Sequence, residues 1–219
     1  MDPLLAFAAS LLALRLAGNL ASRFRARRTP QMGAWAASLF AYAVASAALA
    51  WGSAYGWDEV SFRVYYLFGG LLTAALLGAG SLMLAGQRWV TPVALVYVGL
   101  AVGIAMAEPL TSPVSGEAIP EAQGHLDFVP MRLAAVLGNS LGTIAVVAVA
   151  LLTFRRRPLG NTLIVLGVVA AAGTGLSGLG VAETAAFIAA GALLLYLGFV
   201  QSGRAPAAKR QVDARSHPV

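Results

Sequence analysis

Apolar residues in this chain are gathered into seven blocks, each about 20 residues long, the length at which a helix crosses a bilayer. The blocks cover residues 3–21, 32–55, 60–84, 89–107, 131–154, 159–179 and 182–200. A segment inside lipid must bond its backbone polar groups internally, so it is a helix or part of a closed barrel. Because the alternating ten-residue segments of a barrel are missing, the sequence predicts an all-α membrane protein with seven transmembrane helices.

The connections between the blocks alternate in the sign of their charge. Twelve of the fifteen basic residues belong to one set of connections: Arg23, Arg25, Arg27, Arg28, Arg88, Arg155, Arg156, Arg157, Arg204, Lys209, Arg210 and Arg215. Eight of the nine acidic residues belong to the other set: Asp2, Asp58, Glu59, Glu108, Glu117, Glu121, Asp127 and Glu183. Since short loops rich in Lys and Arg stay cytoplasmic, we predict an inner-membrane protein with its N-terminus outside and its C-terminus inside.

Two further regions lie apart from the blocks. Residues 108–130 contain four prolines and are predicted to form a long outer loop, while residues 201–219 form a basic, disordered cytoplasmic tail. The seven-helix transmembrane domain therefore covers residues 1–200. The net charge of +6 follows the topology, so we expect membrane lipids as partners and no nucleic acid.

Several membrane chemistries need residues that the predicted helices lack. A retinal Schiff base needs a lysine within a helix, and the only lysine is Lys209 in the tail. Haem in a bundle needs histidine ligands, but His125 lies in the outer loop and His217 in the tail. Coupled transport usually needs a carboxylate near mid-membrane, whereas every acid here lies in a loop or within about a turn of a helix end. We therefore expect no cofactor and no coupling ion.

Two basic clusters lie at matching places and suggest an internal repeat. Residues 24–28 follow the first block and residues 154–157 follow the fifth; a proline and two more blocks come after each. This order predicts a three-plus-one-plus-three arrangement, in which block 89–107 links two parallel helix triplets. The charge rule alone also places basic residues at both points, so the pattern has two interpretations.

Two glycine pairs indicate close packing between helices. Gly99 and Gly103, like Gly138 and Gly142, have the GxxxG spacing that lets neighbouring backbones approach. Because the chain has 24 glycines, such pairs also arise by chance. They predict packing and say nothing about a ligand.

Two arginines depart from the charge pattern. Arg63 opens block 60–84 and Arg132 opens block 131–154, so both lie at the outer interface. An arginine there must pair, snorkel or bind a ligand. One interpretation is structural and pairs them with acids at similar depth, namely Asp58, Glu59, Glu108 or Asp127. Arg15, within the first block, is explained by snorkelling toward the cytoplasmic side.

The alternative interpretation is an outward-facing pocket for a small anion or a lipid headgroup. Arginine suits it because its planar fork binds phosphate or carboxylate at two points. Asn139 follows Arg132 by seven residues and shares its helix face. The predicted ligand-binding residues are Arg63, Tyr65, Tyr66, Arg132, Asn139, Ser140 and Thr143, with Trp57 on the wall.

The outer loop carries residues of the types that bind divalent metals. Glu117, Glu121 and His125 would share one face if the loop were helical. Pro120 interrupts such a helix and no second histidine is near, so a solvated acidic loop is the better interpretation. We expect no metal site.

Short segments of the chain resemble known membrane proteins. Residues 62–69 (FRVYYLFG), the set Arg132, Asn139 and Gly142, and residues 160–164 (GNTLI) resemble bacterial seven-helix membrane proteins with no established activity. That resemblance implies the fold and topology only. The pair Pro30-Gln31 is similar to the Pro-Gln pair of PQ-loop (SWEET-type) sugar transporters. The second triplet has Pro158-Leu159 instead, and the third and seventh blocks lack that family's pocket asparagine, so this analogy is limited to architecture.

The first functional prediction is a small uncoupled carrier or binder of a small anion or lipid, with an outward-facing site between the triplets. It requires a water-accessible cavity lined by Arg63, Arg132 and Asn139. The alternative is a non-catalytic membrane scaffold or accessory subunit, in which these groups are paired and the bundle is filled. An intramembrane enzyme comes third, because a hydroxyl such as Ser140 has no visible base.

Overall fold

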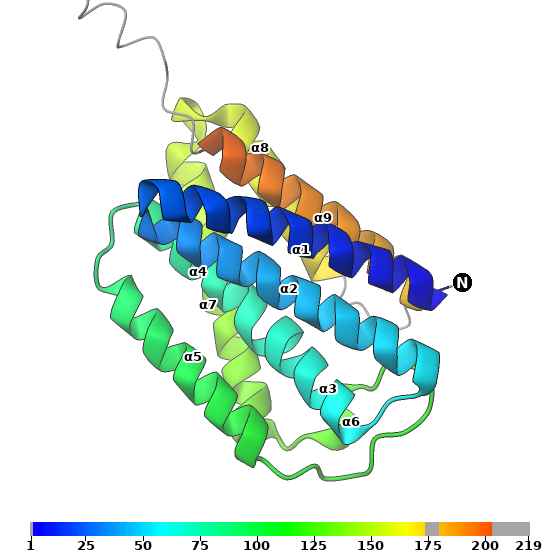
Figure 1. The fold of residues 1–219 in the computed structure, drawn as a ribbon. Coiled ribbons are helices and arrows are strands. Elements are labelled where there is room, and N and C mark those ends of the chain that lie inside the picture. Colours follow the sequence, from blue (N-terminus) through cyan, green and yellow to red (C-terminus); the bar gives the residue numbers. More distant parts are fainter. Residues whose placement is uncertain (1, 174–179, 203–219) are drawn as a thin grey trace, which may run out of the picture.

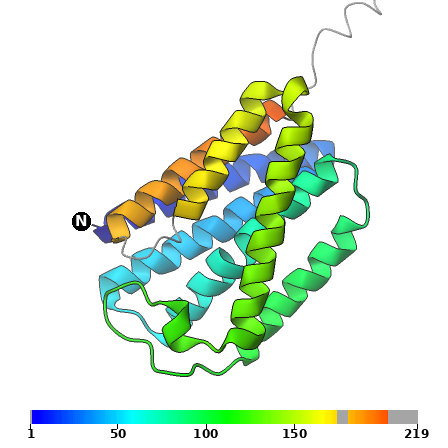
Figure 2. The same ribbon diagram turned by 180° about the vertical axis from the view of Figure 1, so that it is seen from behind.

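The computed structural model describes residues 2–173 and 180–202, and within these ranges the chain is a bundle of helices without strands (Figures 1 and 2). The main helices are α1 (Asp2–Arg27), α2 (Pro30–Tyr55), α3 (Glu59–Tyr65), α4 (Thr73–Leu84), α5 (Val90–Ala107), α7 (Leu133–Thr153), α8 (Pro158–Gly173) and α9 (Val181–Ser202). A π-helical turn, η1 (Tyr66–Leu72), joins α3 to α4. Shorter pieces are α6 (Ala122–His125), η2 (Phe128–Arg132) and η3 (Phe154–Arg156).

Six helical segments among the described residues are long and apolar enough to cross a membrane. They are Pro3–Arg27, Pro30–Tyr55, Glu59–Leu84, Val90–Ala107, Phe128–Arg156 and Val181–Gln201. The prediction of an all-helical membrane protein is confirmed at this level. The sixth predicted block forms the shorter apolar helix α8, and its remaining residues 174–179 lie outside the described ranges. The seventh crossing therefore stays a prediction, and residues 203–219 of the predicted tail also lie outside these ranges.

Two helices extend beyond the predicted blocks, and a third segment contains an additional helix. The first helix continues six residues past the predicted end at residue 21, to Arg27, so part of the basic cluster is helical. Helix α9 continues to Ser202, into the segment assigned to the tail. The outer loop, predicted to hold no helix, contains the short helix α6. The end of an apolar block predicts where the chain leaves the lipid. A helix can continue into water beyond that point, and it ends where other groups satisfy its last backbone carbonyls.

Six helices follow one another around the bundle. Helix α1 packs on α2, α2 on α4, α4 on α7, α7 on α8, α8 on α9, and α9 again on α1. Helix α5 lies outside this ring, against α4, η1 and η2 (Figure 1). Its membrane-length window is 17% buried, against 67% for α2. Helix α5 thus stands away from the bundle over most of its length.

Local sequence explains how the second and third spans begin. Pro30 takes the first turn of α2, where a missing N–H costs nothing. Asp58 and Ser61 form a capping box at the start of α3: the Ser61 N–H donates to Asp58 Oδ1 at 2.7 Å, and the Asp58 N–H donates to Ser61 Oγ at 3.0 Å. Hydrogen bonds from Ser61 hold the pKa of the Asp58 carboxyl below its usual value.

Small residues bring helix backbones together inside the bundle. A Cβ on Gly78 would lie 2.5 Å from Gly142 Cα, so α4 and α7 are in backbone contact. Helices α1 and α2 exchange two hydrogen bonds, because Ser10 Oγ donates to the Ala43 carbonyl and Ser46 Oγ to the Ala6 carbonyl, each at 2.9 Å. Such contacts replace the hydrophobic driving force that is missing between helices in lipid.

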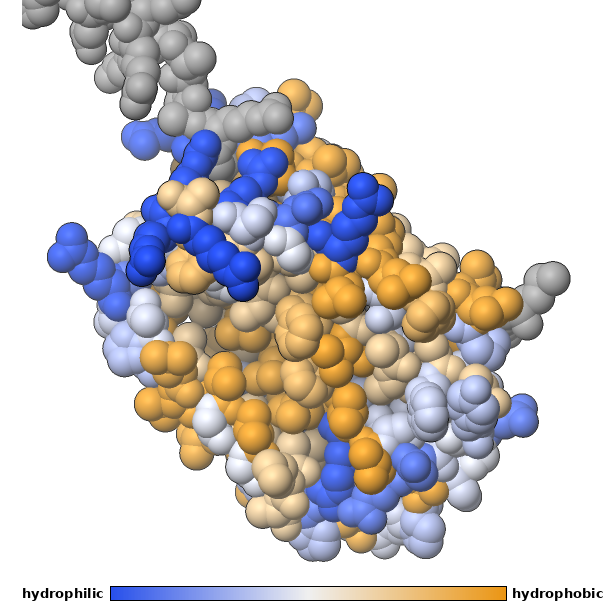
Figure 3. All heavy atoms as spheres, in the orientation of Figure 1, coloured by the Kyte–Doolittle hydropathy of each residue, from blue (hydrophilic) through white to orange (hydrophobic). Residues whose placement is uncertain are grey.

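Figure 3 shows how polarity is distributed along the bundle. Strongly hydrophilic residues gather at the end where α1 stops and α2 begins, and apolar residues cover the middle. Polar residues return at the opposite end, near α3 and α6. The surface therefore has an apolar band between two polar ends, as a bilayer requires.

Candidate functional site

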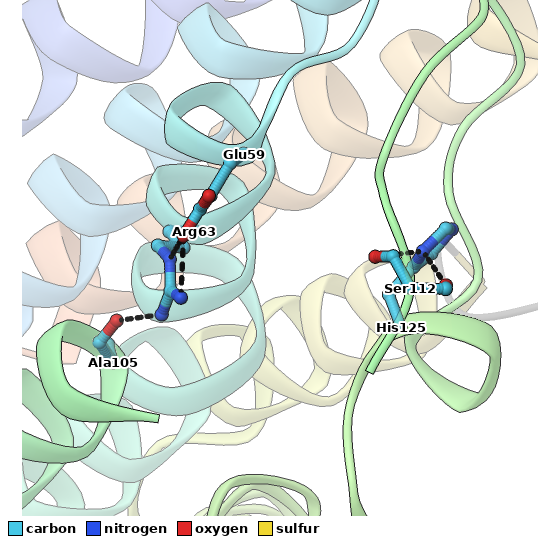
Figure 4. Close-up of polar contacts among 5 residues, drawn as sticks. All are labelled: Glu59, Arg63, Ala105, Ser112 and His125. Atoms are coloured by element: carbon cyan, nitrogen blue, oxygen red, sulfur yellow. Dashed lines mark hydrogen bonds and ion pairs between the residues drawn. The ribbon is translucent and has the colours of Figure 1, made fainter. Parts of the chain in front are cut away.

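Arg63 links α3 to the C-terminal end of α5 (Figure 4). Its Nε donates to Glu59 Oε1 at 2.8 Å, and its Nη2 lies 2.7 Å from the same oxygen. Its Nη1 donates to the Ala105 carbonyl at 2.7 Å. Ala105 is in the last turn of α5, where carbonyls have no partner within the helix and favour a cation. Arg63 is thus engaged by protein groups on both sides.

Asn139 and Tyr97 both bind backbone carbonyls of η1. Asn139 Nδ2 donates to the Gly70 carbonyl at 2.8 Å. The Tyr97 hydroxyl lies 3.0 Å from the Leu71 carbonyl and 3.2 Å from the Ala134 carbonyl. A π-helical turn disturbs the regular backbone ladder, so it offers acceptors to side chains of neighbouring helices. These bonds hold α5 and α7 against the third span.

The other predicted ligand-binding residues are spread over the outer half of the bundle. Tyr65 is half-buried with its ring 5.3 Å from that of the buried Trp57, edge to face. Tyr66 is half-buried and its ring lies 6.0 Å from that of Phe62. Ser140 is exposed, and Thr143 is half-buried. None of the seven predicted residues lines the two hollows described below.

Arg132 differs from Arg63 because it has no ion pair within the described ranges. It is half-buried at the start of α7, and its guanidinium carbon lies 5.6 Å from the centre of the Phe128 ring. It is also close enough to Tyr66 to influence that residue electrostatically. Its planar set of N–H donors is therefore available to a phosphate or carboxylate.

A groove of about 540 Å³ separates α5 from α4 and α7. We call it the α5 groove; its walls include Ala79 and Leu82 from α4, Val93 and Tyr97 from α5, and Leu141 and Ala145 from α7. The lining is almost entirely apolar. Val93 and Leu141 on its rim are 54% and 65% exposed, so the groove opens sideways, within the membrane-length segments.

A second hollow lies next to the α5 groove, toward the C-terminal end of α5. It has a volume of about 430 Å³ and shares Leu100 and Ile104 with the groove. Gly99, Gly103 and Glu108 also line it. A Cβ on either glycine would meet no atom within 4 Å, so these two positions leave open space along α5. The two hollows are thus neighbours along α5, and Glu108 lines the second of them.

Glu108 is a buried carboxylate in the wall of the second hollow. It is 7% exposed, and its carboxylate oxygens make no well-aligned hydrogen bond to the described residues, although the Met131 backbone N–H faces them. Burial raises the pKa of the Glu108 carboxyl above its usual value, and nearby Asp127 adds to this rise. The Met131 backbone N–H and the Arg63 guanidinium oppose it. An ionised carboxylate without a partner is costly to bury, so Glu108 needs a proton or a cation.

The outer loop is folded against the α2–α3 connection. The Gly116 carbonyl accepts from the Trp57 N–H at 2.7 Å. His125 Nδ1 lies 2.8 Å from Ser112 Oγ (Figure 4). The His125 ring also packs edge to face against the Phe62 ring at 5.6 Å. Glu117 and Glu121 are exposed, and the structure brings no three metal-ligating side chains together within the ranges it describes.

Sequence reasoning named Glu108 only as a pairing partner for the arginines and did not find the α5 groove. The position of Glu108 at the end of a block was visible, but its burial depends on the folded outer segment around Met131. Comparison with protein-family models, with curated proteins and with solved structures gives no match to the chain. The resemblance to bacterial seven-helix membrane proteins and the analogy to PQ-loop transporters therefore stay predictions.

Proposed function

We propose that this chain is an uncoupled membrane carrier or binder of a lipid, one of whose acyl chains lies in the α5 groove. The groove itself carries the proposal, because it is apolar, opens sideways and lies within the membrane-length segments. The medium around such an opening in a bilayer consists of acyl chains. Ligand sites are commonly concave apolar hollows with a few polar groups that orient the ligand. Glu108 lines the second hollow, and Arg132 follows Met131, whose backbone N–H faces the Glu108 carboxyl.

The geometry favours a lipid over a small free anion. Arg63 and Asn139, which an anion pocket requires, are bonded to Glu59, Ala105 and Gly70. The α5 groove holds no cationic side chain. A hydrated anion entering it would lose its water without gaining hydrogen bonds, which costs several kcal/mol. An acyl chain meets no such cost.

A non-catalytic scaffold or accessory subunit is the second candidate function. The observation that favours it is the pairing of Arg63 and Asn139 within the protein, as that function predicts. In this case the α5 groove would receive a helix of a partner protein. The lipid binder predicts that the purified chain retains lipid in the α5 groove, and the scaffold predicts that it does not.

The proposal includes seven crossings with the N-terminus outside and the C-terminus in the cytoplasm. Its support is the charge alternation together with the packing of α1 on α9 and of α4 on α7. In each pairing, the first helix of one triplet packs on the last helix of the other, where the triplets are α1–α2–α4 and α7–α8–α9. This is the symmetry that a three-plus-one-plus-three arrangement requires.

A reporter fused after Val219 tests this topology. We expect a C-terminal fluorescent protein to be bright, because positive-inside topology keeps the tail in the cytoplasm. A C-terminal alkaline phosphatase, which is active only outside the cytoplasm, should be inactive. An active phosphatase fusion with a dark fluorescent fusion would contradict the cytoplasmic C-terminus and, for a chain whose N-terminus is outside, an odd number of crossings.

Filling the α5 groove is expected to reduce lipid binding. The substitution Ala145→Phe puts a ring into the groove, where coexistence with an acyl chain would cost about 1–3 kcal/mol of overpacking. The lipid-bound fraction should therefore fall roughly fivefold or more. Native mass spectrometry of the detergent-purified chain measures this fraction.

Ala148→Phe is the matched control, since Ala148 lies on the same helix, is exposed and does not line the groove. It should leave the lipid-bound fraction unchanged. Equal loss in both variants, or no bound lipid on the wild type, would favour the scaffold over the lipid binder.

A further inference from the structure

The polar end of the α5 groove has the charges of a zwitterionic headgroup. Glu108 is an acid without an ion-pair partner, and Arg132 is a base without an acidic partner, within residues 2–173 and 180–202. The Met131 N–H faces the Glu108 carboxylate, and Arg132 is the next residue along the chain. Tyr66 is within electrostatic reach of both Glu108 and Arg132. Glu108 therefore faces the backbone segment that carries Arg132.

The other charged groups near Glu108 do not supply its missing partner. Arg63 is committed to Glu59 and to the Ala105 carbonyl. Asp127 has the same sign as Glu108 and adds to the rise of its pKa. A ligand cation that also donates hydrogen bonds would satisfy both carboxylate oxygens. A primary ammonium does so, because it carries three donors on a compact charge.

Arg132 fits the phosphate of the same molecule. Its guanidinium lies over the Phe128 ring and has no ion pair within the described ranges, which leaves its forked N–H groups for two phosphate oxygens. A phospholipid with a primary amine carries its ammonium two carbons from its phosphate. Its acyl chain would continue along Gly103 and Gly99 into the α5 groove, since the two hollows share Leu100 and Ile104.

We propose that the outer end of the α5 groove selects a phospholipid with a primary amine headgroup, its ammonium at Glu108 and its phosphate at Arg132. This inference rests on the proposed function as a lipid binder. A choline headgroup has no N–H to donate, so it leaves the Glu108 oxygens without hydrogen bonds. A glycerol headgroup brings no cation to Glu108 at all.

Native mass spectrometry with an equal mixture of ethanolamine, choline and glycerol phospholipids of matched acyl chains tests the selection. Wild type should retain the ethanolamine lipid about tenfold over each of the others, equivalent to about 1.4 kcal/mol. The Glu108→Gln variant should still bind lipid but lose this preference. The Arg132→Gln variant should bind all three phospholipids more weakly, with the preference for ethanolamine retained. Glu121→Gln, at an exposed acid of the same loop, should behave as wild type.

A ligand series keeps the test independent of any variant. Ethanolamine phospholipids with zero, one, two and three N-methyl groups lose one N–H donor at each step while they keep the positive charge. Retention by wild type should fall stepwise along this series. Equal retention along the series by a wild type that binds lipid would overturn the headgroup selection and leave the proposed function standing. A wild type that retains no lipid of any class would overturn the proposed function itself.

Discussion

Gly142→Ala is expected to destabilise the fold by about 1–3 kcal/mol, the usual cost of overpacking a filled interior. An added Cβ would lie 2.6 Å from the Ala74 carbonyl carbon and still closer to its oxygen. Both atoms belong to the backbone of α4, so no side chain is able to move aside and the two helices must separate. Thermal unfolding in detergent measures the effect, at roughly 2–4 °C per kcal/mol for a chain of this size.

Gly99→Ala is the matched control, because Gly99 begins the other GxxxG pair. A Cβ there would meet no atom within 4 Å, and alanine favours a helix over glycine by roughly 1 kcal/mol. The melting temperature should stay the same or rise slightly. If both substitutions lowered it equally, the close contact of α4 with α7 would be wrong.

Arg63→Met is expected to release the C-terminal end of α5. The hydrogen bond from its charged side chain to the Ala105 carbonyl is worth about 1.5–3 kcal/mol, and methionine keeps the helix propensity of α3. The Tyr97 hydroxyl still holds the middle of α5, so the release should be confined to the end that Arg63 binds. Hydrogen exchange should accelerate in the last turn of α5, and the melting temperature should fall.

The variant Glu59→Gln separates the two interactions of Arg63. It removes the ion pair with the 61%-exposed Glu59 side chain but leaves the bond to Ala105, so we expect a loss of only about 0–1 kcal/mol. Exchange in α5 should stay slow. If Glu59→Gln and Arg63→Met had equal effects, the ion pair would be the important interaction and the bond to Ala105 would not.

The spans were predictable from the sequence because bilayer thickness fixes the length of an apolar helix. The predicted block 89–107 and the observed helix α5 differ by one residue at the start. Charge alternation adds a second, independent constraint on the same elements. The differences lie at the polar ends, such as Arg27 in α1, where a helix leaves lipid and the bilayer no longer limits it.

The site was less predictable because it depends on which groups face each other. The position of Arg63 at the outer interface was visible, but its partner Ala105 lies 42 residues further along the chain. Asn139 was selected for its helix face, yet its partner Gly70 is 69 residues away, in a π-helical turn. Such a turn inserts an extra residue and rotates the side chains that follow it around the helix axis. A regular helical period therefore predicts the wrong face for the residues of η1 and α4.

The two glycine pairs also show that sequence spacing alone does not predict a contact between helices. Gly138 is in contact with Tyr97 and Gly142 with Ala74, whereas a Cβ on Gly99 or Gly103 would meet no atom within 4 Å. The sequence spacing of the two pairs is identical, and they differ in the atoms that neighbouring helices place against them. A pattern within one helix indicates that a close approach is allowed, and the neighbouring helix decides whether it occurs.

Crosslinking with a phospholipid that carries a photoactivatable diazirine at mid-chain tests the lipid-binding function most directly. In native membranes or nanodiscs of mixed lipids, we predict that the labelled peptides concentrate in α5 and in the facing parts of α4 and α7, around Val93 and Leu141. The exposed face of α1, where Leu4 and Leu11 are 73% and 50% exposed, serves as the internal reference. Equal labelling of α1 and the α5 groove would show that the groove holds no lipid in preference to any other apolar surface, and would contradict the proposed function.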